Sequence, residues 1–111
     1  MTKNGAEHPE VIDLVSENDS DIILIIIQTE SLDEKLLLKM QDKINNYLSF
    51  AENGELQKLY PDAIGKNVVV RLDMYEKIDP AALDFFEKVK ALLADNDVKF
   101  TWAECEYWSR V

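Results

Sequence analysis

The sequence predicts an α+β protein, a two-layer sandwich in which two helices cover one face of a mainly antiparallel sheet of four to five strands. Short runs of β-branched residues, two longer stretches with helical periodicity and the turn-forming residues between them support this prediction. The expected order is strand, strand, helix, strand, strand, helix, strand. With 111 residues the chain has the length of one domain. We expect residues 1–10 to form a flexible tail and residues 11–111 a single domain.

The first two strands are predicted to form an antiparallel hairpin. Residues 11–15 and 22–29 are rich in β-branched side chains, and residues 17–21 between them are turn formers. The six consecutive residues from Ile22 to Ile27 are all apolar. Because side chains alternate between the two faces of a strand, the second strand is apolar on both faces.

The first helix is predicted over residues 31–53. Ser31 and Glu34 have the spacing of a capping box, and Asn53-Gly54 is a typical helix stop. Apolar residues recur at helical spacing between these ends. The same periodicity assigns Lys43 to the polar, solvent-facing side of the helix.

The second half of the chain contains the remaining strands and the second helix. Residues 55–60 alternate weakly and are predicted as a short strand, and residues 67–75 are the clearest strand of the chain. Asp79-Pro80 opens the second helix, because Asp is a good cap and Pro suits the first helical position. This helix is expected to stop near residues 95–97, and residues 98–102 alternate as a final strand.

The charge is strongly negative and unevenly distributed. The net charge is −10, and residues 1–34 hold nine acidic residues and one lysine, a net of −8. Such a field repels nucleic acid and anionic membranes and favours a basic partner. Cys105 is the only cysteine, and no apolar run is long enough for a signal peptide or a membrane span. We therefore expect a soluble, cytoplasmic protein.

The chain lacks the residue patterns of standard catalytic and metal sites. His8, the only histidine, lies in the predicted tail, and the three glycines are isolated. Glu17, Asp19 and Asp21 have the spacing that opens a calcium loop, but the Gly and Glu required later in that loop are absent. Cys105 stands between two glutamates that disfavour its thiolate. We predict no catalytic residue, no metal and no cofactor, and we expect the protein not to be an enzyme.

The apolar second strand raises the question of what covers the face without helices. The C-terminal segment, a second copy of the chain and a different partner are three possibilities. Aromatic residues near the C-terminus suit an interface, although they suit the edge of a core equally well. The residues predicted for this interface are Ile23, Ile25, Ile27, Val69, Tyr75, Trp102, Tyr107 and Trp108.

Several segments also resemble a known family. The residues that carry the resemblance include Val11 to Leu14, Gln41 to Phe50 and the loop Tyr60-Pro61-Asp62-Ala63-Ile64-Gly65. Over roughly residues 9–102 the chain resembles a family of small uncharacterised bacterial proteins catalogued as a domain of unknown function. The resemblance implies a bacterial source and a single domain. It implies no activity and no functional residue for this chain.

Three functions remain open from the sequence. The first is a non-enzymatic protein-association module, in its simplest form a homodimer through the free sheet face. The second is an immunity-type inhibitor that binds a basic toxin. The acidic N-terminal third of the chain is the basis of this hypothesis. The third is a small enzyme without a recognisable motif.

Overall fold

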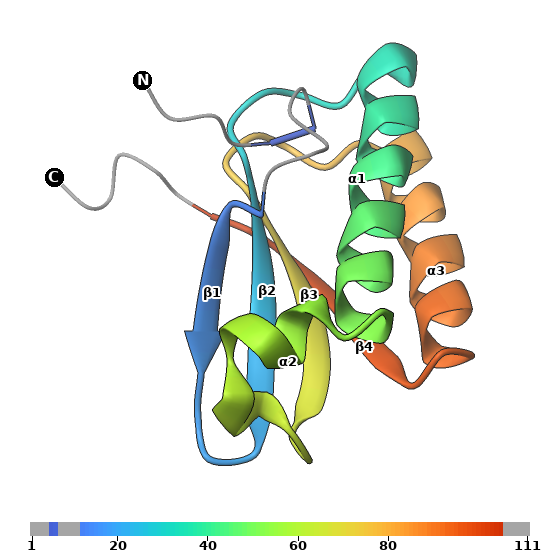
Figure 1. Cartoon of the computed structure of the whole chain (residues 1–111). Coiled ribbons are helices and arrows are strands. Elements are labelled where there is room, and N and C mark those ends of the chain that lie inside the picture. Colours follow the sequence, from blue (N-terminus) through green and yellow to red (C-terminus); the bar gives the residue numbers. More distant parts are fainter. Residues whose placement is uncertain (1–4, 7–11, 106–111) are drawn as a thin grey trace, which may run out of the picture.

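A four-stranded sheet with helices packed on one face makes up the fold (Figure 1). The computed structural model describes residues 5–6 and 12–105. This part confirms the predicted α+β class and contains three helices rather than two. No helix within it is long and apolar enough to cross a bilayer. The elements in chain order are β1 (Leu14–Glu17), β2 (Asp21–Gln28), α1 (Glu34–Glu52), α2 (Glu55–Leu59), η1 (Pro61–Ala63, a 3₁₀ turn), β3 (Asn67–Met74), α3 (Pro80–Ala94) and β4 (Val98–Glu104).

The sheet is mixed, so the prediction of a mainly antiparallel sheet is wrong. Its order is β1-β2-β3-β4, and only β1 and β2 are antiparallel, while β2, β3 and β4 run parallel. The cause lies in residues 55–60, which were expected to add a strand but contain α2 instead. Glu, Leu, Gln and Lys favour a helix, and Leu56 alone among residues 55–59 is buried. The helical crossover then returns the chain to the same end of the sheet, which makes β2 and β3 parallel.

All helical segments of the described chain pack on one face of the sheet. The two crossovers move one strand further in the same direction, and such connections are right-handed in nearly all proteins. Helices α1 and α3 therefore lie on the same side (Figure 1). The core between the layers includes Ile22, Leu24 and Ile26 of β2, Val70, Leu72 and Met74 of β3, Phe100 of β4, Met40, Ile44 and Tyr47 of α1, Leu56 of α2, and Phe86 and Leu93 of α3.

Most element ends follow the sequence signals. The predicted turn after β1 is confirmed, and it is fixed by Asn18, whose side-chain oxygen accepts from the amides of Ser20 and Asp21 at 2.9 and 2.8 Å. Helix α3 begins as predicted, with the Asp79 side chain accepting from the Ala82 amide at 2.9 Å. After α1, Gly54 adopts a φ of 92°, which suits a residue without Cβ.

The start of α1 differs from the prediction. The helix begins at Glu34, and Asp33 is its cap, with a side chain that accepts from the Leu36 amide at 2.8 Å. Ser31 therefore lies before the cap, and the predicted capping box is wrong. Asp is as good a cap as Ser, so the sequence signal admits both starting points.

Candidate functional site

The face of the sheet without helices is the first candidate site, and we call it the open face. Strand register defines its members, because residues paired across neighbouring strands point to the same side. The open face consists of Leu14 and Ser16 of β1, Asp21, Ile23, Ile25 and Ile27 of β2, Asn67, Val69, Arg71 and Asp73 of β3, and Lys99, Thr101 and Ala103 of β4.

The centre of the open face is apolar. The structure brings the predicted residues Ile23, Ile25, Ile27 and Val69 together on it, in adjacent strands. Ile25 is only 2% exposed, and the other three are half-buried. Parallel strands are normally covered on both faces, so a parallel sheet with one helix-free face is an unusual arrangement.

The predicted aromatic residues do not all join this face. Trp102 pairs with Leu72 and thus points to the helix side, where its ring lies 5.5 Å from that of Phe86 between centroids. Tyr75 lies just beyond β3, and its N–H donates to the Gln28 carbonyl at 2.9 Å. Tyr107 and Trp108 lie outside the described residues. Trp102 is therefore a residue of the core edge.

The charged groups of the open face balance one another. Arg71 donates to both carboxylate oxygens of Asp73, at 2.9 and 3.1 Å, and the Asp21 carboxylate accepts from the Asn67 amide at 3.2 Å. Lys99 is exposed. With two acidic and two basic side chains, the face has a formal net charge of zero, in contrast to −10 for the whole chain.

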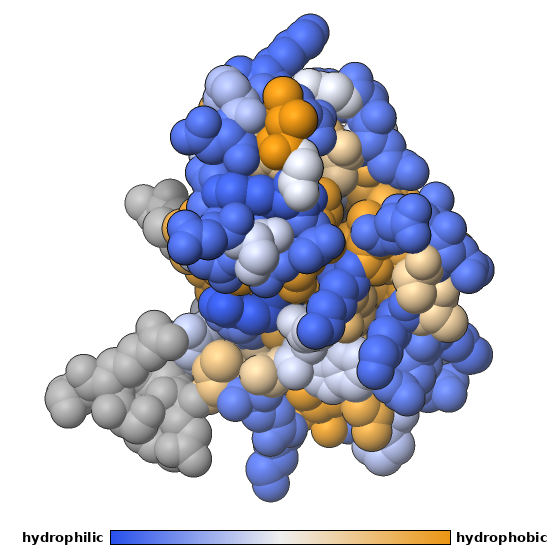
Figure 2. All heavy atoms as spheres, turned by 90° about the horizontal axis from the view of Figure 1, so that it is seen from below, coloured by the Kyte–Doolittle hydropathy of each residue, from blue (hydrophilic) through white to orange (hydrophobic). Residues whose placement is uncertain are grey.

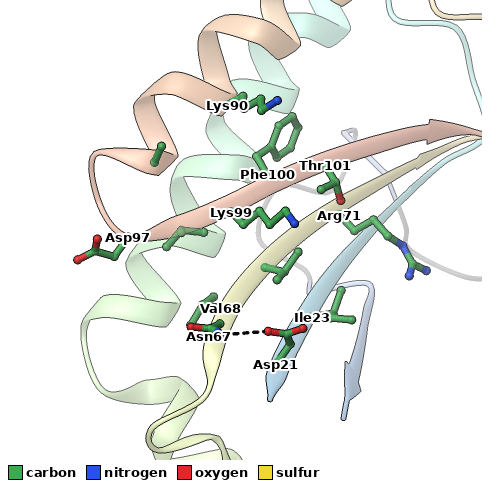
Figure 3. A pocket seen from close by; sticks show the side chains of 13 residues that line it. Asp21, Ile23, Asn67, Val68, Arg71, Lys90, Asp97, Lys99, Phe100 and Thr101 are labelled. Atoms are coloured by element: carbon green, nitrogen blue, oxygen red, sulfur yellow. Dashed lines mark hydrogen bonds between the residues drawn. The ribbon is translucent and has the colours of Figure 1, made fainter. Parts of the chain in front are cut away.

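A hollow of about 610 Å³ borders the open face along β3 and β4 (Figure 3). Val69, Lys99 and Thr101 line it on the open side, and it reaches round β4 to Lys90 of α3. Its wall combines apolar side chains with both basic and acidic groups. The end of the molecule seen in Figure 2 differs from the apolar centre of the open face. Hydrophilic residues dominate this end, and apolar atoms are visible in the gaps between them.

A buried polar cluster on the helix side is the second candidate. Lys43 Nζ lies 2.6 Å from Asp13 Oδ1, and both side chains are completely buried. The other oxygen of Asp13 accepts from the Ile27 amide at 2.9 Å. Because β1 begins only at Leu14, this carboxylate satisfies a β2 amide that has no ladder partner. The assignment of Lys43 to the solvent side of the helix was therefore wrong.

Tyr47 extends this cluster. Its hydroxyl donates to the Ile25 carbonyl at 3.0 Å and accepts from the Asp13 amide at 2.8 Å. Burial raises the pKa of the Tyr47 phenol well above its ordinary value, so the group stays protonated at neutral pH. A phenol fixed in this way acts as a structural link between α1 and β2.

The cluster also holds a part of the predicted N-terminal tail. The Gly5 amide donates to Asp13 at 3.0 Å and the Gly5 carbonyl accepts from Lys43 at 2.8 Å. The Ala6 amide donates to the Gln28 side chain at 2.8 Å, and Ala6 is completely buried. Gly5 and Ala6 are thus built into the core, while the other residues of the predicted tail, His8 included, lie outside the described residues.

The polar groups of this cluster are hydrogen-bonded to the backbone and to one another. Within residues 5–6 and 12–105, no three potential metal-ligand side chains cluster together. Asp19 lies in the β1–β2 turn, Asp21 is the first residue of β2, and Glu17 pairs with Lys66 at 3.0 Å. Cys105 is half-buried at the end of β4. The sequence did contain a signal for the missed cluster, because Lys43 lies three residues after Met40 and four before Tyr47, within the buried stripe of α1.

Fold and site together define a small α+β domain whose sheet presents one helix-free face with an apolar centre and a formal net charge of zero. The sequence matches the family of unknown function DUF6572 over residues 5–106, and the chain belongs to this family. The resemblance to a family of unknown function is thereby confirmed. No curated protein and no solved structure is significantly similar to the chain.

Proposed function

We propose that the chain is a non-enzymatic protein-association module that presents the open face to a protein partner. The observation that carries the proposal is the apolar centre of this face, formed by Ile23, Ile27 and Val69 on strands that run parallel. Helices normally cover such strands on both sides, and here they occupy one side only. A partner protein supplies the second cover.

The polar groups of the face support a binding role. Arg71 and Asp73 satisfy each other, so burying them under a partner leaves no unpaired charge between them. The buried Lys43–Asp13 pair lies on the other side of the sheet and is completely shielded from solvent. This distribution suits a surface for association better than a site for chemistry on a small molecule.

A pair of matched substitutions tests the proposal. Val69→Asp places a carboxylate in the apolar centre of the open face, and Leu38→Asp places the same group on α1, where Leu38 is 66% exposed. We expect the tagged chain in extracts of its native cell to elute as a complex larger than the free chain. Val69→Asp should shift it to the free chain's elution volume, and Leu38→Asp should not. Equal elution of both variants and the unaltered chain would contradict the proposal.

A further inference from the structure

The charge of the open face distinguishes it from the rest of the chain. Its four charged side chains sum to zero, whereas the chain carries −10. Two copies of so acidic a chain repel each other through any surface that shares this charge. The open face lacks this repulsion, and a basic partner would be attracted instead to the acidic surfaces outside it. The charge of the face therefore suits a second copy of the same chain.

One register row crosses the open face from β1 to β4. Leu14 on β1 is 50% exposed, and it shares one register row with Ile25, Arg71 and Thr101 across the four strands. Thr101, at the opposite end of this row, lines the hollow of about 610 Å³ (Figure 3). An exposed apolar side chain and a hollow able to receive one thus lie at the two ends of one row.

Two symmetric face-to-face arrangements align the strands of the two copies, and they place the ends of this row differently. A two-fold axis parallel to the strands, between β2 and β3, exchanges β1 with β4, so that Leu14 of each copy lies over the hollow of the other. An axis perpendicular to the strands brings the two Leu14 side chains together and leaves both hollows open to water. The first arrangement places both exposed leucines in hollows, so we expect it to bury more apolar surface.

We propose that the partner of the open face is a second copy of the chain, stacked about the axis parallel to the strands, with Leu14 of each copy in the hollow of the other. The proposal rests on the proposed function and adds the identity of the partner. The resulting dimer has two sheets in the middle, about 10 Å apart as in other sheet packings, and the helices outside.

Light scattering coupled to size exclusion tests the identity of the partner. The purified full chain should show twice the chain mass of 12.8 kDa. Leu14→Glu should raise the dissociation constant by at least about tenfold, because each copy loses a buried leucine. Leu38→Glu on α1 is the control and should leave the dissociation constant unchanged. Circular dichroism should show that both variants are folded. A mass of 12.8 kDa at all concentrations would overturn the proposal.

This outcome is distinguishable from failure of the proposed function. A monomeric pure chain that still loses its complex in native extracts on Val69→Asp would mean a different partner on the same face. A monomeric chain on which Val69→Asp has no effect in extracts would overturn both proposals.

Cross-linking tests the arrangement of the two copies. Chains carrying Leu14→Cys are mixed with differently tagged chains carrying Thr101→Cys, both in a Cys105→Ser background, and treated with a short bis-maleimide. The axis parallel to the strands predicts cross-links between the two kinds of chain. Cross-links confined to pairs of Leu14→Cys chains would overturn this arrangement.

Discussion

The Lys43 ammonium lies 2.6 Å from the Asp13 carboxylate with both side chains completely buried, and the pair joins α1 to the residue just before β1. It also connects two distant parts of the chain, since Lys43 binds the Gly5 carbonyl and Asp13 binds the Ile27 amide. The first two strands and the N-terminal residues are thereby fixed to the helix layer.

Removing one partner of this pair should destabilise the protein strongly. Lys43→Met leaves Asp13 as a buried charge without its cation, and we expect the free energy of unfolding to fall by about 3–5 kcal/mol. The control is Lys88→Met, which breaks an exposed pair with Asp84 and should cost less than about 1 kcal/mol. Urea denaturation of both variants measures the difference. A similar fall in the free energy of unfolding of the two variants would show that the buried pair contributes no more to stability than the exposed pair.

Stability should decline at alkaline pH because of Tyr47. The pKa of the Tyr47 phenol is raised in the folded state. Its contribution to the free energy of unfolding is therefore complete below the ordinary pKa of about 10, where Tyr47 of the unfolded chain begins to ionise. As the pH rises above that value, stability should fall by up to about 1.4 kcal/mol per pH unit.

Two variants isolate the contribution of Tyr47. Tyr47→Phe should be less stable at neutral pH, because the Asp13 amide and the Ile25 carbonyl lose their partner, and its stability should depend less on pH above 10 than that of the unaltered chain. Tyr60→Phe should retain the full dependence. Denaturation at a series of pH values provides the comparison, and parallel curves for Tyr47→Phe and the unaltered chain would refute the assignment.

Gly5 should be sensitive to any side chain. Its φ is 86°, and an added Cβ would lie 2.7 Å from Gln28 Oε1 and 3.2 Å from the Ile27 carbonyl oxygen. Gly5→Ala therefore combines backbone strain with a clash and should cost about 2–3 kcal/mol. Gly54→Ala is the matched control, because its φ of 92° brings the strain alone, about 1 kcal/mol, with no atom within 4 Å of the added Cβ. Equal melting temperatures for the two variants would contradict this role of Gly5.

Trp102 should matter for stability rather than association. Its ring packs against Phe86 and Phe100 at centroid distances of 5.5 and 5.7 Å. Because the side chain is only half-buried, Trp102→Ala should lower the free energy of unfolding by about 2–3 kcal/mol. The folded fraction should elute from native extracts like the unaltered chain. A loss of the complex without a loss of stability would assign Trp102 to the interface.

Local signals in the sequence predicted most of the fold. Asn18, Gly54 and Asp79 mark ends of elements through their own backbone preferences, and the apolar residues from Ile22 to Ile27 indicated a strand with two apolar faces. Strand direction could not be predicted in this way, because it depended on whether residues 55–60 crossed the sheet as a helix.

The candidate sites were predicted less completely. The apolar part of the open face followed from strand alternation, but the hollow depends on how β3, β4 and α3 come together. Lys43 was misassigned because a charged residue is rarely buried, and its partner Asp13 lies 30 residues away in the sequence. A pair so distant in the sequence becomes visible only in the folded chain.

Site-specific photo-cross-linking in the native cell tests directly whether the open face binds a protein partner. A photoreactive amino acid replaces Val69 on the open face or, as the control, Leu38 on α1. We expect intermolecular cross-links to protein from position 69 and few from position 38. Cross-links from position 69 that are only intramolecular, or equal yields from both positions, would contradict the claim that the open face binds a protein partner.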